Sequence, residues 1–172
     1  MKAWMRIFFY GVLAWAVITQ ASAQSNLAAK VSSDGVTEVS MRTGKAVVTV
    51  KITTHKLDIG ADTQVPPQQR STNCTYSRFP CSLVDDVEIF VGLEPLFVAR
   101  SVYSDLADLV EARISEPKPK LYVLSMKGGD GAEGYMARVT FDRSRVRLRE
   151  IMDTATGKIR QRTTYLPQPS LN

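Results

Sequence analysis

The fold is decided mainly by residues 83–114, which read LVDDVEIFVGLEPLFVARSVYSDLADLVEARI. Val87, Ile89 and Val91 occupy alternate positions, so three β-branched side chains share one face of a predicted strand. The segment 92–95 contains a glycine and a proline, which favour a turn. Residues 96–98 are apolar and supply a partner strand. The first half of the stretch therefore predicts a β-hairpin.

The second half of the stretch predicts the one helix of the chain, over residues 101–116. Ser101 is a candidate N-cap and Ser104 is an alternative. Pro117 and Pro119 end the segment, because proline cannot continue the helical hydrogen-bond ladder. The apolar residues recur at helical spacing, at Val102, Leu106, Leu109, Val110 and Ile114.

Further strands are predicted on both sides of this unit, separated by turn-forming residues. Their ranges are 36–41 and 46–53 before it, and 120–127, 134–141, 145–152 and 158–166 after it. The predicted fold class is α+β and mainly antiparallel β. It is a twisted sheet or a two-layer β meander covered by the single helix, with a long disulfide-pinned loop over residues 56–82.

The amino terminus predicts export. Lys2 and Arg6 precede an apolar run over 7–18, and Ala21-Ser22-Ala23 forms a cleavage site, as in a secretory signal peptide. The run is shorter than the ~20 residues of a membrane-spanning helix, so an integral membrane protein is not expected. Cleavage after Ala23 would send residues 24–172 to the periplasm or the exterior as one domain, with loose ends at 24–34 and 167–172.

The net charge of the chain excludes few classes of binding partner. The chain has a formal net charge of +5, and removal of the signal peptide takes two basic residues and no acid, which leaves +3. The domain has no aromatic-interleaved RNA-binding motif, and export separates it from nucleic acid. Nucleic acid is therefore not an expected partner.

The two cysteines, Cys74 and Cys81, are expected to form a disulfide in an exported chain. Such a short ring stabilises the fold by about 2–3 kcal/mol in the chain-entropy model. A redox-active pair usually has C-x-x-C spacing, which this chain lacks. Only His55 could join the thiols at a metal, so neither a metal nor a cofactor is expected.

The long loop over residues 56–82 supports two interpretations. Tyr76, Arg78 and Phe79 lie inside the disulfide ring, and arginine beside aromatic residues is typical of binding hot spots. These three residues are the predicted partner-binding loop. The alternative is a variable surface excursion that the disulfide holds in place.

Arginines recur on the late strands. A two-residue turn between Asp142 and Arg145 would place Arg138 opposite Arg149 and Thr140 opposite Arg147. Like charges in opposing positions need compensation, and a polyanion would provide it. The alternative is a solvated sheet face with acids such as Glu150 nearby. The predicted anion-binding face comprises Arg138, Arg147, Arg149, Arg160 and Arg162.

No set of catalytic residues is predicted. The chain lacks the G-x-S-x-G motif of a nucleophile elbow, and the glycine-rich segment 128–134 lacks the Lys-Ser/Thr pair of a phosphate loop. A hydrolase of envelope polymers stays open as a third hypothesis. Its candidate residues are His55, Asp85, Asp86, Asp130 and Glu133.

The leading hypothesis is a small exported binding protein that recognises another envelope or secreted protein, as an inhibitor or immunity-type factor. The alternative is a binder of lipopolysaccharide or acidic glycan through the arginine-lined face. An exported chain with one predicted disulfide, a long loop and no catalytic set motivates both.

Overall fold

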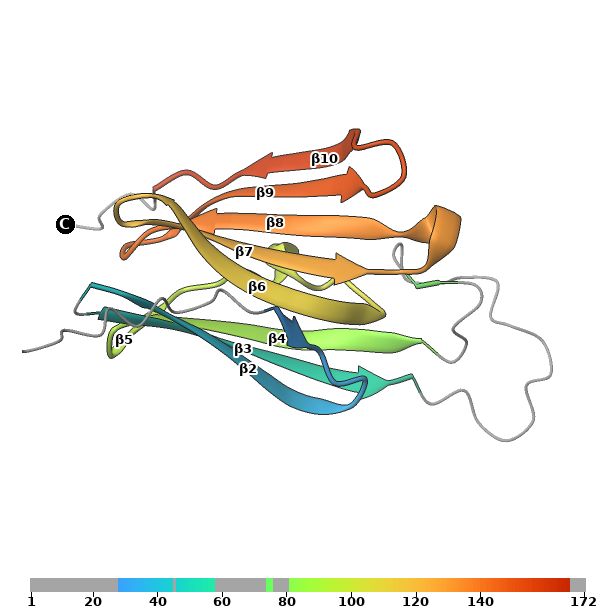
Figure 1. The fold of residues 1–172 in the computed structure, drawn as a ribbon, viewed down its shortest axis with the longest axis horizontal. Helices are drawn as coiled ribbons and strands as arrows, with labels where there is room; N and C mark the ends of the chain where they lie inside the picture. The colour runs from blue at the N-terminus through green and yellow to red at the C-terminus, as the bar shows by residue number, and fades with distance from the viewer. Residues whose placement is uncertain (1–27, 45, 58–73, 76–80, 168–172) are drawn as a thin grey trace, which may run out of the picture.

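The computed structural model describes residues 28–44, 46–57, 74–75 and 81–167. Two antiparallel sheets stack face to face (Figure 1). Their strands are β1 (Ala29–Lys30), β2 (Gly35–Thr43), β3 (Ala46–Lys56), β4 (Ser82–Val91), β5 (Glu94–Leu96), β6 (Leu109–Lys118), β7 (Leu121–Gly128), β8 (Tyr135–Phe141), β9 (Val146–Asp153) and β10 (Ile159–Thr164). The prediction of a mainly antiparallel β fold is confirmed, and of the two predicted arrangements the two-layer one is present. The α+β class is wrong, because the described residues contain no α-helix.

One sheet has the strand order β1-β6-β7-β8-β9-β10 and the other β2-β3-β4-β5. Strands β6 to β10 form a meander in which each strand pairs with the next along the chain. The predicted hairpin is present as β4 and β5, with Val91 opposite Glu94, but its turn is residues 92–93 and its second strand is Glu94–Leu96, not 96–98. Short turns between sequence neighbours explain why β7 to β10 were predictable.

The core fills the space between the two sheets. Val48, Val50 and Ile52 alternate along β3 and are fully buried. The same core cluster contains the inward-facing residues of β8, whose side chains at alternate positions are also buried: Tyr135, Ala137, Val139 and Phe141. Strict alternation with one buried face is the pattern expected of a two-layer sandwich.

The predicted helix over residues 101–116 is wrong. The described residues contain no α-helix; residues Arg100–Val102 form one 3₁₀ turn, Gly131–Glu133 form another, and β6 begins at Leu109. Asp108 has a φ of 51°, which interrupts any right-handed helix through this segment. Ser101 and Ser104 therefore cap no α-helix.

A β-bulge explains why the sequence imitates a helix. Leu109 pairs with Gly128 and Glu111 pairs with Lys127, so Val110 is an extra residue in β6. The inward-facing side chains of β6 consequently lie at Leu109, Ala112 and Ile114. Spacings of three and two residues replaced the strict alternation that identifies a strand.

The amino-terminal segment is more ordered than predicted. Residues 29–30 form β1, in which Ala29 lies opposite Ala112 of β6. Val31 is buried, and its backbone N–H donates to the carbonyl of Val110 at 3.1 Å. The prediction of a loose segment over residues 24–34 is therefore wrong for residues 29–31. The predicted signal peptide lies outside the described residues and stays a prediction.

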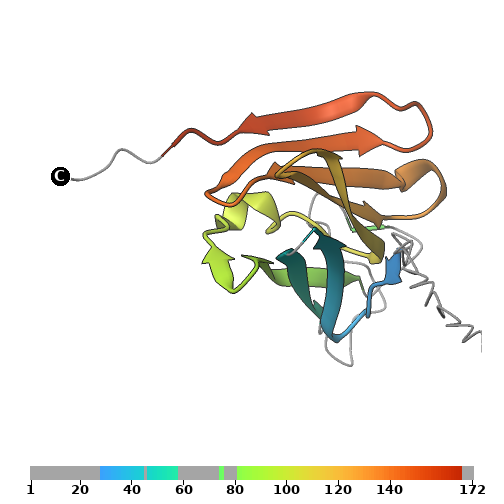
Figure 2. The ribbon, with the colours of Figure 1, turned by 60° about the vertical axis from the view of Figure 1, so that its left-hand side comes forward.

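The sandwich has two ends of different construction (Figures 1 and 2). We call one the disulfide end; it contains the end of β3, the start of β4 and the β7–β8 and β9–β10 connections. We call the other the open end; it contains the β6–β7 and β8–β9 turns and the end of β10. Residues 97–108 run between the sheets from the open end to the disulfide end.

Candidate functional site

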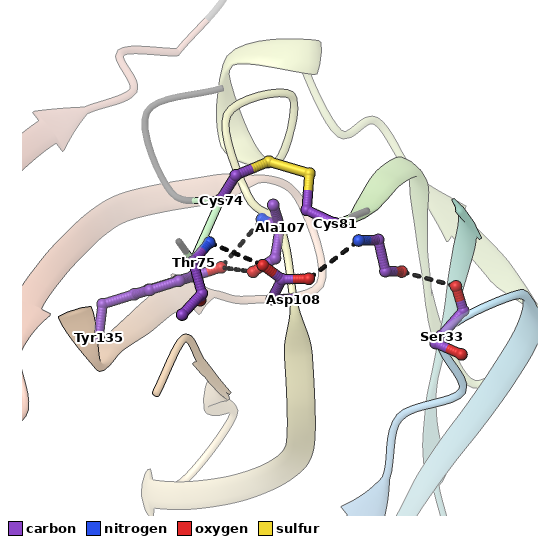
Figure 3. The surroundings of a disulfide bond; sticks show 8 residues. Ser33, Cys74, Thr75, Cys81, Ala107, Asp108 and Tyr135 are labelled. Carbon is purple, nitrogen blue, oxygen red and sulfur yellow. Dashed lines mark hydrogen bonds between the residues drawn. A yellow bond between two sulfur atoms is a disulfide. The ribbon is translucent and has the colours of Figure 1, made fainter. Parts of the chain in front are cut away.

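At the disulfide end, one carboxylate joins the two sides of the disulfide ring. Cys74 and Cys81 are bonded, as predicted. Asp108 accepts hydrogen bonds from the backbone N–H of the residue after each cysteine, Thr75 at 2.7 Å and Ser82 at 2.9 Å (Figure 3). The Asp108 side chain is buried, and each of its oxygens takes one of these donors. The carboxylate thereby binds the ring to the start of β6.

Tyr135 closes the same region from β8. Its hydroxyl donates to the carbonyl of Ala107 at 2.6 Å and accepts from the N–H of Ala107 at 3.0 Å (Figure 3). Burial raises the pKa of the Tyr135 phenol, so it stays neutral at physiological pH. A Cβ at Gly128 would come within 2.5 Å of the Tyr135 ring, which requires glycine there. Packing therefore accounts for at least this glycine of the 128–134 segment.

The disulfide end has the composition of a metal site but not its chemistry. One Sγ from each cysteine and one oxygen of Asp108 all lie within 4.8 Å of one another. The sulfurs are bonded to each other, and a metal requires free thiolates. The buried Thr75 Oγ1 has no hydrogen-bond partner among the described residues. We interpret this cluster as a structural connection between loop and sandwich.

The hydrolase candidates do not form one site. His55 Nδ1 lies 2.7 Å from Asp85 Oδ1, and both side chains are almost half exposed. Asp86 lies opposite Thr53 on the same sheet. Asp130 and Glu133 belong to the β7–β8 connection of the other sheet. An exposed His–Asp contact at a strand end is a surface interaction, with little effect on stability.

The predicted register of the arginine strands is wrong beyond the first pair. Phe141 lies opposite Val146 as expected, but Thr140 lies opposite Leu148. Arg147 is therefore the extra residue of a second β-bulge. The shift places Arg138 opposite Glu150 and removes the predicted Arg138–Arg149 repulsion.

The same shift turns Arg149 into the core, where its side chain is 1% exposed. Its Nε donates to the carbonyl of Val102 at 2.9 Å and its Nη1 to Gln161 Oε1 at 3.0 Å, while Nη2 pairs with Asp105. Arg149 therefore holds the segment 97–108 against the six-stranded sheet. It does not lie on the predicted anion-binding face.

Acids of the protein itself compensate the other arginines of that face. Arg147 pairs with Asp142, Arg160 with Asp153, and Arg162 with Glu150. Glu150 thus has arginines opposite it on both neighbouring strands, from Arg138 of β8 and Arg162 of β10. This alternation of charges across the strands is the solvated-face alternative. Arg147 also lines a hollow at the open end.

Three other cations gather at the open end. Lys118 and Lys120 flank the β6–β7 turn, and Arg143 lies in the β8–β9 turn. The two turns face each other across an open hollow of about 440 Å³, which Lys118, Lys120, Arg143 and Arg147 line. All three turn cations are exposed, and none forms an ion pair within the described part of the chain. We call these three residues the cation triad.

The acid that lines this hollow, Asp142, is already engaged. Its carboxylate accepts from the backbone N–H groups of Ser144 at 2.7 Å and Arg145 at 3.0 Å, from the Ser144 hydroxyl, and from Arg147. Burial alone would raise the pKa of Asp142, but these hydrogen bonds outweigh it and lower the pKa to about 2. Asp142 is therefore ionised and bound chiefly by these donors and Arg147, so it offsets the charge of the cation triad only in part.

A second hollow adjoins the first, and we call it the apolar hollow after the exposed side chains of Phe97 and Leu166. Its volume is about 690 Å³, and its lining also includes Tyr165, Arg145 and Arg147. Phe97 and Leu166 are among the most exposed large apolar residues, at 73% and 79%. Ser144 and Arg147 line both hollows, so the β8–β9 turn is their common wall.

Sequence reasoning missed this site. The sequence predicts a helix terminator over 117–119 and a strand that begins at Lys120, and no pattern places Lys118 and Lys120 beside Arg143 in another turn. The alternation of proline and lysine was the available signal. The predicted partner-binding residues Tyr76, Arg78 and Phe79 lie outside the described residues, so that prediction stays untested.

Comparisons of the chain with protein-family models, with characterised proteins and with solved structures found no match. Among the described residues, no helix is long and apolar enough to cross a membrane.

Proposed function

We propose that this protein is an exported binding protein that recognises an anionic component of the cell envelope at its open end. The observation that carries the proposal is the cation triad: three exposed cations line one hollow, and the only acid of its lining is occupied by other donors. Phosphate, sulfate and carboxylate groups bind arginine and lysine through charge-assisted hydrogen bonds.

The charge distribution supports the open end over the strand face. On the strand face, Glu150 and Asp153 already neutralise Arg162 and Arg160. An anion arriving there would have to displace these carboxylates. At the open end, none of the three triad side chains forms an ion pair among the described residues, so ligand binding to the triad breaks no existing ion pair.

Charge reversal tests the proposal. The triple variant Lys118→Glu, Lys120→Glu, Arg143→Glu is compared with the control Lys30→Glu, Lys56→Glu, Lys127→Glu, which changes the net charge equally at exposed positions elsewhere. The probe is dextran sulfate, titrated by calorimetry against the oxidised protein from about 0.05 to about 0.5 M salt.

The wild type and the control should bind dextran sulfate with an affinity that falls steeply as salt rises. The triad variant should lose binding at every salt concentration. Equal binding by both triple variants would move the site away from the open end, and salt-independent binding would contradict an electrostatic site.

A further inference from the structure

We infer that the anionic ligand carries an alkyl or acyl chain, so that the open end binds a phosphorylated lipid by head group and tail together. This inference rests on the proposed function and identifies the class of its ligand. The observation behind it is the common wall: Ser144 and Arg147 face the cation triad on one side and the apolar hollow on the other.

The apolar hollow is built by contacts within the protein. The backbone N–H of Tyr165 donates to the carbonyl of Arg147 at 3.0 Å, and the Tyr165 hydroxyl lies 3.3 Å from Ser101 Oγ. Arg145 reaches the Tyr165 carbonyl at 3.5 Å. These contacts fix the carboxyl-terminal side of the hollow against the segment 97–108, so the wall exists before a ligand arrives.

The exposed side chains specify an apolar occupant. Phe97 and Leu166 lie on this hollow with most of their surface in water, and burying such side chains is favourable. The hollow lies within the range of about 300–1,000 Å³ that is usual for small-molecule sites. A simple polyanion would fill the cationic hollow and leave the apolar one wet.

The charge pattern specifies where the head group lies. Arg147 is at the junction of the two hollows, and the triad continues from it on the side of the β6–β7 turn. A phosphate bound by the triad would lie beside this junction, so its chain could enter the apolar hollow while the Arg147–Asp142 ion pair stays intact. The arrangement matches an amphiphile with one charged end, which an acidic glycan does not provide along its length.

A series of alkyl phosphates of increasing chain length tests the inference. Inorganic phosphate is the reference ligand, because it has no alkyl chain. Binding is measured on the oxidised protein by calorimetry, below the concentration at which each compound forms micelles. Affinity should rise by about fourfold for each methylene added until the hollow is full. Dextran sulfate is titrated in parallel, because it reports the proposed function without a chain.

The matched variants are Phe97→Ser with Leu166→Ser in the apolar hollow, and Val36→Ser with Leu93→Ser at equally exposed apolar positions outside it. The first pair should weaken octyl phosphate binding by about tenfold or more and leave dextran sulfate binding unchanged. The second pair should change neither.

Each outcome decides between the two proposals. The lipid inference would be overturned if affinity did not depend on chain length, or if the Phe97→Ser, Leu166→Ser variant still bound octyl phosphate. Dextran sulfate binding would in that case still support the proposed function. Failure of the wild type to bind either probe would overturn the proposed function and the inference with it.

Discussion

The two ends of the sandwich use their polar groups in opposite ways. At the disulfide end, Asp108 and Tyr135 are buried and bonded to backbone groups of neighbouring segments. At the open end, the cations of the triad extend into water beside exposed apolar side chains. Buried polar groups must be satisfied internally, whereas exposed charges remain available to a ligand. We therefore interpret the disulfide end as a set of stabilising contacts between segments and the open end as the ligand-binding site.

The largest expected effect is the loss of the Asp108 carboxylate. Asp108→Ala leaves the buried N–H groups of Thr75 and Ser82 without an acceptor and places alanine at a φ of 51°. We expect the free energy of unfolding to fall by about 4 kcal/mol, measured by urea denaturation of the oxidised protein.

Asp108→Gly separates the two causes of this loss. Glycine removes the carboxylate but tolerates the left-handed backbone. The free energy of unfolding of Asp108→Gly should therefore be about 1 kcal/mol higher than that of Asp108→Ala. The exposed Glu38→Ala is the control and should change the stability little. An Asp108→Ala variant as stable as the control would show that the disulfide end does not depend on this carboxylate.

The second-largest expected effect is the loss of stability when Arg149 of β9 is replaced, compared with replacement of Arg147 in the same strand. Arg149→Met keeps an apolar stem but leaves the carbonyl of Val102 without its donor in the core. We expect a loss of about 3 kcal/mol. Arg147→Met at the open end should cost less than about 1 kcal/mol, because its side chain is half exposed. Thermal unfolding at several denaturant concentrations measures both, and equal losses would contradict the assignment of Arg149 to the core.

Acid should lower the stability of the protein by protonating one aspartate at each end of the sandwich. Asp142 at the open end and Asp153 at the disulfide end both have a pKa lowered to about 2, Asp153 chiefly by its hydrogen bond from Arg160. A depressed folded-state pKa stabilises the protein above the unfolded value near 4 and loses that contribution as pH falls toward 2. Stability should therefore decline over this window.

The double variant Asp142→Asn, Asp153→Asn tests that origin of the acid sensitivity. It should be less stable than the wild type at neutral pH and should lose less stability between about pH 4 and pH 2. Denaturant midpoints collected across this range provide the measurement. If the variant lost as much stability as the wild type over this pH range, other carboxylates would be responsible for the acid sensitivity.

The smallest expected effect sharpens the functional side of the comparison. Asp142→Asn removes the one acid that lines the cationic hollow, so dextran sulfate should bind about threefold to fivefold more tightly at low salt. Asp153→Asn removes an equivalent charge at the other end and should leave affinity nearly unchanged. Equal gains from both variants would indicate a response to net charge alone.

Local patterns predicted much of the fold. The alternation in β3, β4 and β8 and the turn-forming residues between neighbouring strands were sufficient to place most of the meander. The helix prediction failed at Val110, and the arginine register failed at Arg147, because each residue is the extra position of a β-bulge. A bulge changes which face every following residue occupies, and it is decided by pairing with another strand.

The candidate site could not be predicted in the same way. Lys118, Lys120 and Arg143 come from turns more than twenty residues apart in the chain, and Phe97 comes from a third segment. No periodicity connects them, because their proximity results from strand order in the folded sheet. A run of basic residues in sequence would have been visible; a cluster assembled from separate turns was not.

By itself, the sequence determined the antiparallel β class, most strand positions and the pairing of Cys74 with Cys81, since alternation and turn chemistry are local and the chain has only two cysteines. Only the tertiary structure decided that Asp108 binds both sides of the disulfide ring, that Arg149 is buried, and that the open end joins a cationic hollow to an apolar one. Those features depend on contacts between segments that are distant in the chain, and such contacts leave no periodic signal in the residues that make them.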